Sequence, residues 1–241
     1  MARVMVESDV DSMVFNDGSL DEVGVFRILP DGLKGLGAVP PREKAIPRPQ
    51  QDGDYAPSRL TSGGRTITIS AEAVGLSTLD SAQLEDRICD LMNREIKVTV
   101  ENAHGRRYFY GRLGDDPSPS MYMGERLFTF TLIITVDDPL KYGDPVAFTA
   151  SNGLLIVENT GRAASYPRVH VDGNVTRLTL TLGIRTVKWS GNSTSLDLDF
   201  RDMLPSAGIA TGQAFKIPPG RSAINVSSDG TVSMTVIPAW R

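Results

Sequence analysis

The chain has 241 residues, of which 40% are apolar and 22% charged, with a formal net charge of −4. These proportions are ordinary for a globular protein and exclude a globally disordered chain. No stretch approaches the roughly 20 apolar residues of a membrane helix, so we expect no membrane insertion. The single cysteine, Cys89, excludes an internal disulfide and a cysteine-cluster metal site, and we interpret it as a small buried or half-buried apolar residue.

The charge is unevenly distributed along the chain. Residues 1–150 carry 16 Lys+Arg and 23 Asp+Glu, a net −7, whereas residues 151–241 carry 9 and 6, a net +3. Neither half shows the basic stripe that nucleic-acid binding needs, and the acidic half would repel phosphate. The first residues turn acidic before an apolar run develops. We therefore expect no secretory signal and synthesis in a cytoplasm.

The first 64 residues divide into a strand-like part and an irregular part. Residues 4–28 contain short apolar runs, and the Asn-Asp-Gly step at 16–18 predicts a tight hairpin turn. Residues 29–64 contain six prolines and six glycines. This composition predicts no regular structure, and we interpret the segment as a functional arm or a mobile linker.

Regular structure is predicted to resume at residue 65, where isoleucines alternate with hydroxyl residues. A helix is expected over residues 81–93, with Asp80 as its N-cap and Gln83 completing a capping box. Its apolar stripe would be Leu84, Ile88, Leu91 and Met92. Strands are predicted at 96–101 and 107–113, joined by a turn that contains His104.

Residues 127–136 form the clearest predicted strand, because every even position is apolar and most odd positions carry a hydroxyl group. Pro139 has no backbone donor, so the sheet must stop near Asp138. The stop falls between halves of different charge. We therefore interpret residues 137–143 as the joint between two domains, with Asp137 and Asp138 favoured there by local turn chemistry.

Residues 151–241 are predicted to consist of short strands and turns, which is typical of a β-sandwich. Turns are expected at Gly191-Asn192 and between two strands of a hairpin, 224–226 and 232–236. His170 is expected on the outward face of a strand, and Asp197 and Asp199 on the solvent side of another.

The chain offers no convincing catalytic set. Zinc-binding histidine pairs and the nucleophile elbow of serine hydrolases are missing from the sequence. Asp197 and Asp199 project in parallel from one strand rather than facing each other across a cleft, as a glycosidase requires. The glycines at 32, 35 and 37 precede prolines instead of a helix, so they lack the anion-binding N-terminus of a phosphate loop. No catalytic, metal-binding or cofactor-binding residue is assigned, and no cofactor or enzymatic activity is expected.

The order of these elements resembles the distal tail protein family of long-tailed phages with flexible, non-contractile tails. The segments that carry the resemblance span about 200 residues: PQQDGDY (49–55), RTITI (65–69), the helix, the strand pair, DPLKY (138–142), NTG (159–161), YP (166–167), DG (172–173), LDLD (196–199), FKIPPG (215–220) and Trp240.

The resemblance implies a mainly β fold with one short helix, in which an N-terminal ring-forming domain (1–148) precedes a galectin-like β-sandwich (149–241). It also implies a structural virion protein, six copies of which close into a ring at the distal end of the tail. The implied neighbours are the tail tube protein, a tail-tip or fibre-bearing protein and the tape measure protein, with DNA passing through the centre. The acidic half would suit such a channel, although ordinary solubility charge explains it equally well.

Two other classes of function stay open. A galectin-like sandwich is compatible with a carbohydrate-binding adhesion module that recognises host surface sugars. The aromatic residues of 151–241 show no exposed platform in the sequence pattern, and most are interpreted as core. A tail-associated hydrolase is the third class, and it lacks the catalytic set described above.

Overall fold

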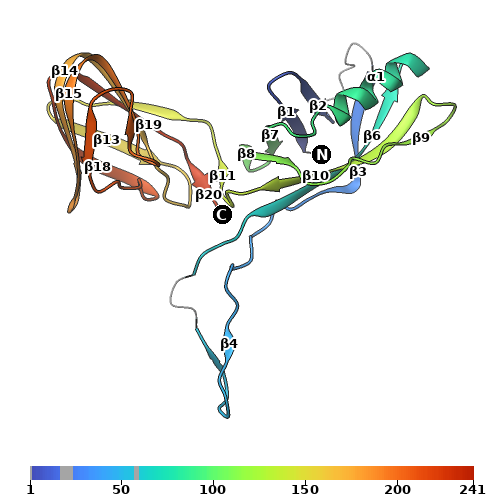
Figure 1. Ribbon diagram of the computed structural model, residues 1–241, viewed down its shortest axis with the longest axis horizontal. Coiled ribbons are helices and arrows are strands. Elements are labelled where there is room, and N and C mark those ends of the chain that lie inside the picture. Colours follow the sequence, from blue (N-terminus) through green and yellow to red (C-terminus); the bar gives the residue numbers. More distant parts are fainter. Residues whose placement is uncertain (1, 17–23, 57–59) are drawn as a thin grey trace. The chain divides into compact units, whose positions relative to one another are not determined.

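The computed structural model describes residues 2–16, 24–56 and 60–241. The chain divides into two compact units, Met1–Pro139 and Leu140–Arg241, each with its own apolar core. Both are built from strands, and the described residues contain one α-helix (Figure 1). The predicted fold class, mainly β with a single short helix, is confirmed.

In the first unit, one sheet closes on itself into a barrel. The strands follow the order β8-β7-β1-β2-β3-β6-β10, and β10 also pairs with β8 through Ile134 and Leu113. The short strand β9 extends the sheet beyond β10. The bounds are β1 (Arg3–Glu7), β2 (Ser12–Phe15), β3 (Gly24–Lys34), β6 (Arg65–Gly75), β7 (Ile96–Asn102), β8 (Gly105–Leu113), β9 (Ser120–Tyr122) and β10 (Leu127–Val136).

The alternation predicted for β10 is confirmed along its whole length. Every even position is buried and every odd position is half-buried. The neighbouring strand β6 alternates in the same way, and the register places Leu132 opposite Ile69 and Ile134 opposite Ile67. The apolar faces of both strands line the barrel core, so the hydroxyl faces lie together on the outside.

The helix α1 (Thr78–Cys89) begins and ends earlier than the sequence pattern indicated. Its N-cap is Ser77, whose hydroxyl oxygen accepts from the Asp80 amide at 3.2 Å and donates to the Asp80 carboxylate at 2.8 Å. Ser77 therefore caps the helix, and the predicted N-cap Asp80 with its capping-box partner Gln83 is wrong. After Cys89 the backbone hydrogen bonds join residues three positions apart instead of four, as in a turn, and the helix ends there.

The segment 29–64 is less irregular than predicted. Strand β3 continues through Pro30 to Lys34, with a break in register between Ile28 and Leu33, and a proline is tolerated at such a bulge. Farther along, β4 (Ile46–Pro47) and β5 (Asp54–Tyr55) form a small hairpin. Figure 1 shows this hairpin at the end of two stems that leave β3 and β6. We call residues 35–64 the arm.

The turn predicted at residues 16–18 extends outside the described residues. The strands on either side of it, β2 and β3, pair in parallel through Phe15 and Phe26. A tight hairpin turn reverses the chain direction and joins antiparallel strands, so these two parallel strands do not form the predicted hairpin.

The second unit is a sandwich organised by one long bent hairpin. Strands β14 (Arg168–Leu182) and β15 (Arg185–Asp199) each run through both layers. The first part of β14 pairs with β19 and its last part with β18, and the register shifts between Asp172 and Arg177. The other strands are β11 (Lys141–Tyr142), β12 (Val146–Thr149), β13 (Leu154–Asn159), β16 (Leu204–Pro205), β17 (Ile209–Gly212), β18 (Gly220–Ser228), β19 (Thr231–Val236) and β20 (Ala239–Trp240).

One turn and one hairpin predicted for this unit are wrong, although the chain does bend at residues 229–230 between β18 and β19. Gly191 and Asn192 lie inside β15, and a side chain at Gly191 would collide with the Trp189 ring. The glycine therefore allows close packing rather than a change of direction. Strands β18 and β19 pair with different parts of β14 instead of with each other, so they connect the two layers.

Candidate interaction surfaces

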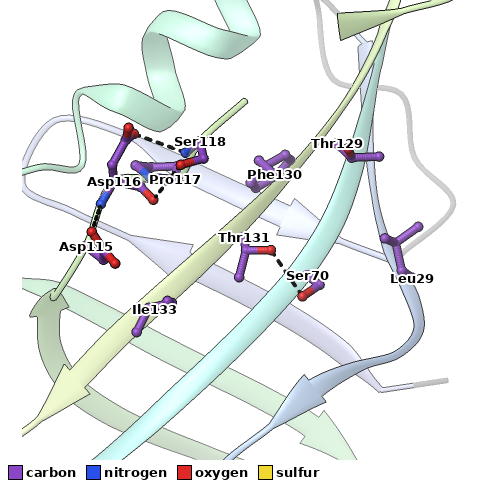
Figure 2. Close-up of a pocket in the computed structure, with 10 residues that line it drawn as sticks. All are labelled: Leu29, Ser70, Asp115, Asp116, Pro117, Ser118, Thr129, Phe130, Thr131 and Ile133. Carbon is purple, nitrogen blue, oxygen red and sulfur yellow. Dashed lines mark hydrogen bonds between the residues drawn. The ribbon is translucent and has the colours of Figure 1, made fainter. Parts of the chain in front are cut away.

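The hydroxyl faces of β6 and β10 form the floor of an open hollow of about 450 Å³ in the first unit (Figure 2). Ser70 and Thr131 lie side by side on this floor, with their hydroxyl oxygens 3.2 Å apart. Leu29 and Ile133 add apolar surface at its edges. The hollow therefore combines hydroxyl and aliphatic groups on rigid strands.

Residues 115–118 form an acidic rim above this floor. The loop is fixed to β10 because the Thr131 amide donates to the Pro117 carbonyl oxygen at 3.0 Å. One oxygen of Asp115 accepts from the Asp116 amide at 2.9 Å, and one oxygen of Asp116 accepts from the Ser118 amide at 3.0 Å. Both carboxylates are exposed, and neither forms an ion pair with a cation of the part of the chain that the structure describes. Each retains an oxygen that can accept from a partner.

The end of β10 is held by a buried arginine that sequence reasoning missed. Arg65 is 6% exposed and pairs in register with Val136. Its guanidinium donates through Nε and Nη2 to the Pro139 carbonyl, and through Nη1 to the carbonyls of Gly35 and Gly37 at 3.2 Å each. Burial lowers the pKa of Arg65, and the nearby Asp138 partly offsets this effect. We call this contact the arginine clamp, because it ties the base of the arm to the end of β10.

Asp137 at the predicted joint contacts a neighbouring strand. Its carboxylate lies 2.7 Å from Nη1 of Arg112, and both side chains are exposed. The prediction of local turn chemistry therefore misses this cross-strand ion pair. A pair this exposed contributes little to stability, typically about 0–1 kcal/mol.

The histidine and the acidic pair of the second unit meet on one strand face. His170 lies directly opposite Asp197, with Nδ1 2.7 Å from the carboxylate, and its Nε2 is 3.1 Å from Asp172. These two hydrogen bonds raise the pKa of His170. Asp199 is bound by the Arg168 guanidinium at 2.9 Å. The acidic pair is thus engaged in cross-strand ion pairs on an outward face, as expected for solvent-side residues.

The remaining sequence candidates occupy structural positions. His104 lies in the exposed β7–β8 turn, where its amide donates to Asn102 at 2.8 Å. Gly32 and Gly35 approach β6 so closely that a Cβ atom would overlap the carbonyl oxygens of Ser70 and Thr66. Among residues 2–16, 24–56 and 60–241, no group of three or more His, Cys, Asp or Glu is placed to hold a metal ion. No described helix is long and apolar enough to cross a membrane.

The aromatic residues of the second unit do not form an exposed platform. Trp189, Phe200 and Phe215 are at most 2% exposed, and the last two stack edge to face in the core. Tyr166 and Trp240 are half-buried. A sugar site usually requires an exposed ring, so the described part of this unit lacks that feature.

No protein-family model matches the sequence, and no curated protein matches it either. Solved structures do match. The chain is similar to the SPP1 Dit protein, described as a paradigm of the hub adsorption apparatus in phages that infect Gram-positive bacteria, with a TM-score of 0.70 and 15% identity over 99% of each chain.

A second similarity is to the baseplate of phage p2 in its activated conformation. In the strontium form the TM-score is 0.56 at 10% identity over 98% of each chain, and in the calcium form it is 0.52 at 10% identity over 99% of this chain and 98% of the other. Over its whole length the chain therefore has the fold of the SPP1 Dit protein, and its resemblance to distal tail proteins is confirmed.

Proposed function

We propose that this chain is a structural, non-enzymatic protein of a phage tail and that six copies close into a ring, which forms a hub at the distal end of the tail. The observation that carries this proposal is the similarity of both units to the SPP1 Dit protein over 99% of each chain. That protein is described as a hub of an adsorption apparatus, and the p2 chains belong to a baseplate.

In this role the ring joins the tail tube protein to a tail-tip or fibre-bearing protein, and the tape measure protein is a further candidate neighbour. DNA passes through the centre without specific binding. The net charge of −7 over residues 1–150 supports such a passage, because an acidic wall repels phosphate. The protein would be made in the cytoplasm of the host bacterium and then located in the virion.

The arm supports ring closure. A closed ring repeats one heterologous interface by rotation, so each copy needs an element that reaches its neighbour. Residues 40–56 are exposed throughout, and a two-stranded hairpin as short as β4–β5 is not stable by itself. Contact with a neighbouring copy would cover the arm and supply the missing packing.

Light scattering and electron microscopy of the purified full chain test the proposal. The expected mass is about 157 kDa, six times the chain mass of 26.1 kDa, and the expected image is a ring with a central opening. Antibodies against the chain should label virions at the distal end of the tail. A species of 26.1 kDa at every concentration, together with virions labelled elsewhere or not at all, would contradict the proposal.

The carbohydrate-binding alternative is not favoured by any contact in the second unit, because its largest aromatic side chains are buried. Glycan-array binding by the full chain is the measurement that would support it.

A further inference from the structure

The hollow over β6 and β10 and the tip of the arm carry complementary chemistry. At the tip, the Arg48 guanidinium lies over the Tyr55 ring, 5.2 Å from its centre, and Ile46 is paired with Tyr55 in register. Ile46 and Tyr55 are 66% and 56% exposed, and because they are paired they form one contiguous apolar surface that no core of the hairpin covers. The tip therefore presents a cation, an aromatic ring and an aliphatic group on one small surface.

The hollow presents the matching groups. Asp115 and Asp116 at its rim each have a second carboxylate oxygen that can accept a hydrogen bond, and neither forms an ion pair within the described ranges. Ser70 and Thr131 add hydroxyl groups, and Leu29 adds apolar surface. A guanidinium fits two carboxylate oxygens especially well, because its donors form a planar fork.

We propose that this hollow binds the Arg48–Tyr55 tip of the arm from a second copy of the same chain. The inference rests on the proposed ring and specifies where one copy meets the next. Arg48 pairs with Asp115 and Asp116, while Tyr55 and Ile46 cover the aliphatic edge of the hollow.

The length of the arm supports a second copy as the occupant. Roughly a dozen residues separate Lys34 at the end of β3 from Ile46, and an extended chain of this length reaches up to about 40 Å. A unit of this size has a radius of gyration of only about 14 Å, so the tip can pass well beyond its own barrel. The arginine clamp fixes the base of the arm beside the end of β10, so only the distal part has to order on binding.

Cross-linking between two differently tagged full-length chains tests the contact. Both carry Cys89→Ser; one also carries Gln51→Cys at the tip of the arm, and the other carries Ser120→Cys, which pairs with Thr129 beside the hollow. A short bismaleimide should join the two chains into a mixed dimer. Adding Arg48→Gln to the first chain, or Asp115→Asn with Asp116→Asn to the second, should reduce the yield at least about tenfold, as loss of a charge-assisted contact predicts. Arg42→Gln, which removes an exposed arm cation outside the hairpin, is the matched control and should leave the yield unchanged.

The outcomes separate this inference from the ring itself. Mixed cross-links that disappear with either charge-removing variant, and return when Arg48→Asp is combined with Asp116→Arg, support the docking site. A ring without mixed cross-links, or with cross-links that ignore the charge variants, overturns the docking site and leaves the ring proposal standing. A third variant carries both Gln51→Cys and Ser120→Cys in one chain. If this variant cross-links within itself and the two singly substituted chains do not cross-link to each other, the arm folds back and the inference is overturned. A protein that neither assembles nor cross-links overturns both proposals.

Discussion

Replacing Arg65 with alanine is expected to destabilise the first unit selectively. The side chain is buried, donates to three backbone carbonyl groups and lies over the Phe109 ring at 5.2 Å. Each hydrogen bond from a charged donor contributes about 1.5–3 kcal/mol, but water reaches some of the carbonyls once the side chain is gone. We therefore expect a loss of about 3 kcal/mol rather than the full sum, which corresponds to a Tm lower by about 10 °C for a unit of this size.

The two tryptophans make the assay specific to each unit. Trp189 and Trp240 both lie in the second unit, so tryptophan fluorescence follows that unit alone, whereas calorimetry follows both. Arg65→Ala should lower the calorimetric transition of the first unit and leave the fluorescence transition in place. Proteolysis of the arm should also accelerate, because the carbonyls of Gly35 and Gly37 lose their anchor.

Two further variants make the result decisive. Arg65→Lys keeps the charge but cannot reach all three carbonyls, so its loss should be intermediate. Arg42→Ala removes an exposed cation of the arm and should change the Tm of neither unit. A destabilisation by Arg65→Ala of less than about 1 kcal/mol, or one matched by Arg42→Ala, would refute the role of the arginine clamp.

Four other predictions follow from the contacts described above. Leu132→Ala in the β10 core should lower the unfolding free energy by about 2–5 kcal/mol, and Thr131→Ala one position away should lower it by about 1 kcal/mol or less. Urea unfolding measures both values, and equal losses would contradict a strand with one buried and one outward face. Ser77→Ala should cost about 1 kcal/mol and Gln83→Ala almost nothing, a contrast that would be reversed if the helix began where the sequence indicated. The pKa of His170 is raised in the folded state, so its ion pairs stabilise the second unit fully below the unfolded pKa of about 6.5, and this stabilisation is lost as the pH rises through the higher folded pKa. The effect is at most about 1 kcal/mol on this exposed face. His170→Gln should abolish this pH dependence of the unfolding free energy, measured by tryptophan fluorescence. Cys89 is exposed, not buried or half-buried as the sequence indicated. Partial desolvation and the fields of Glu85, Asp116 and Asp86 raise the pKa of its thiol, so iodoacetamide should alkylate it more slowly at pH 8 than a free thiol, and Glu85→Gln should accelerate the reaction. A rate equal to that of free cysteine would contradict this environment.

The sequence predicted best where one local pattern controls the structure. Strand β10 follows its alternation from Leu127 to Val136 without an exception, because a strand with one buried face tolerates no shift by a single residue. The helix was placed correctly in the chain but its start was not. Both Ser77 and Asp80 are good N-caps, and the choice depends on contacts such as the bond from the Ser81 hydroxyl to the Arg126 carbonyl, which no local pattern reveals.

Local sequence patterns could not predict the contacts between residues far apart in the chain. Gly191 resembles a turn residue in sequence, yet it packs against the Trp189 ring inside a continuous strand. The buried Asn159 amide donates to the carbonyls of Ala163 and Ile217 at 3.0 Å, and the second of these lies 58 positions away. Such bonds satisfy buried polar groups and depend on how the chain returns to the same place.

The sequence by itself determined the β-rich class, the two-faced strand and its end before Pro139, because periodicity and proline chemistry act locally. Only the tertiary structure decided that the first sheet closes between β10 and β8, that Arg65 joins three separate carbonyls, and that Asp115 and Asp116 stand over a hydroxyl-lined hollow. These features bring together residues far apart in the chain. Their positions follow from strand order and register, which depend on the packing of the whole barrel.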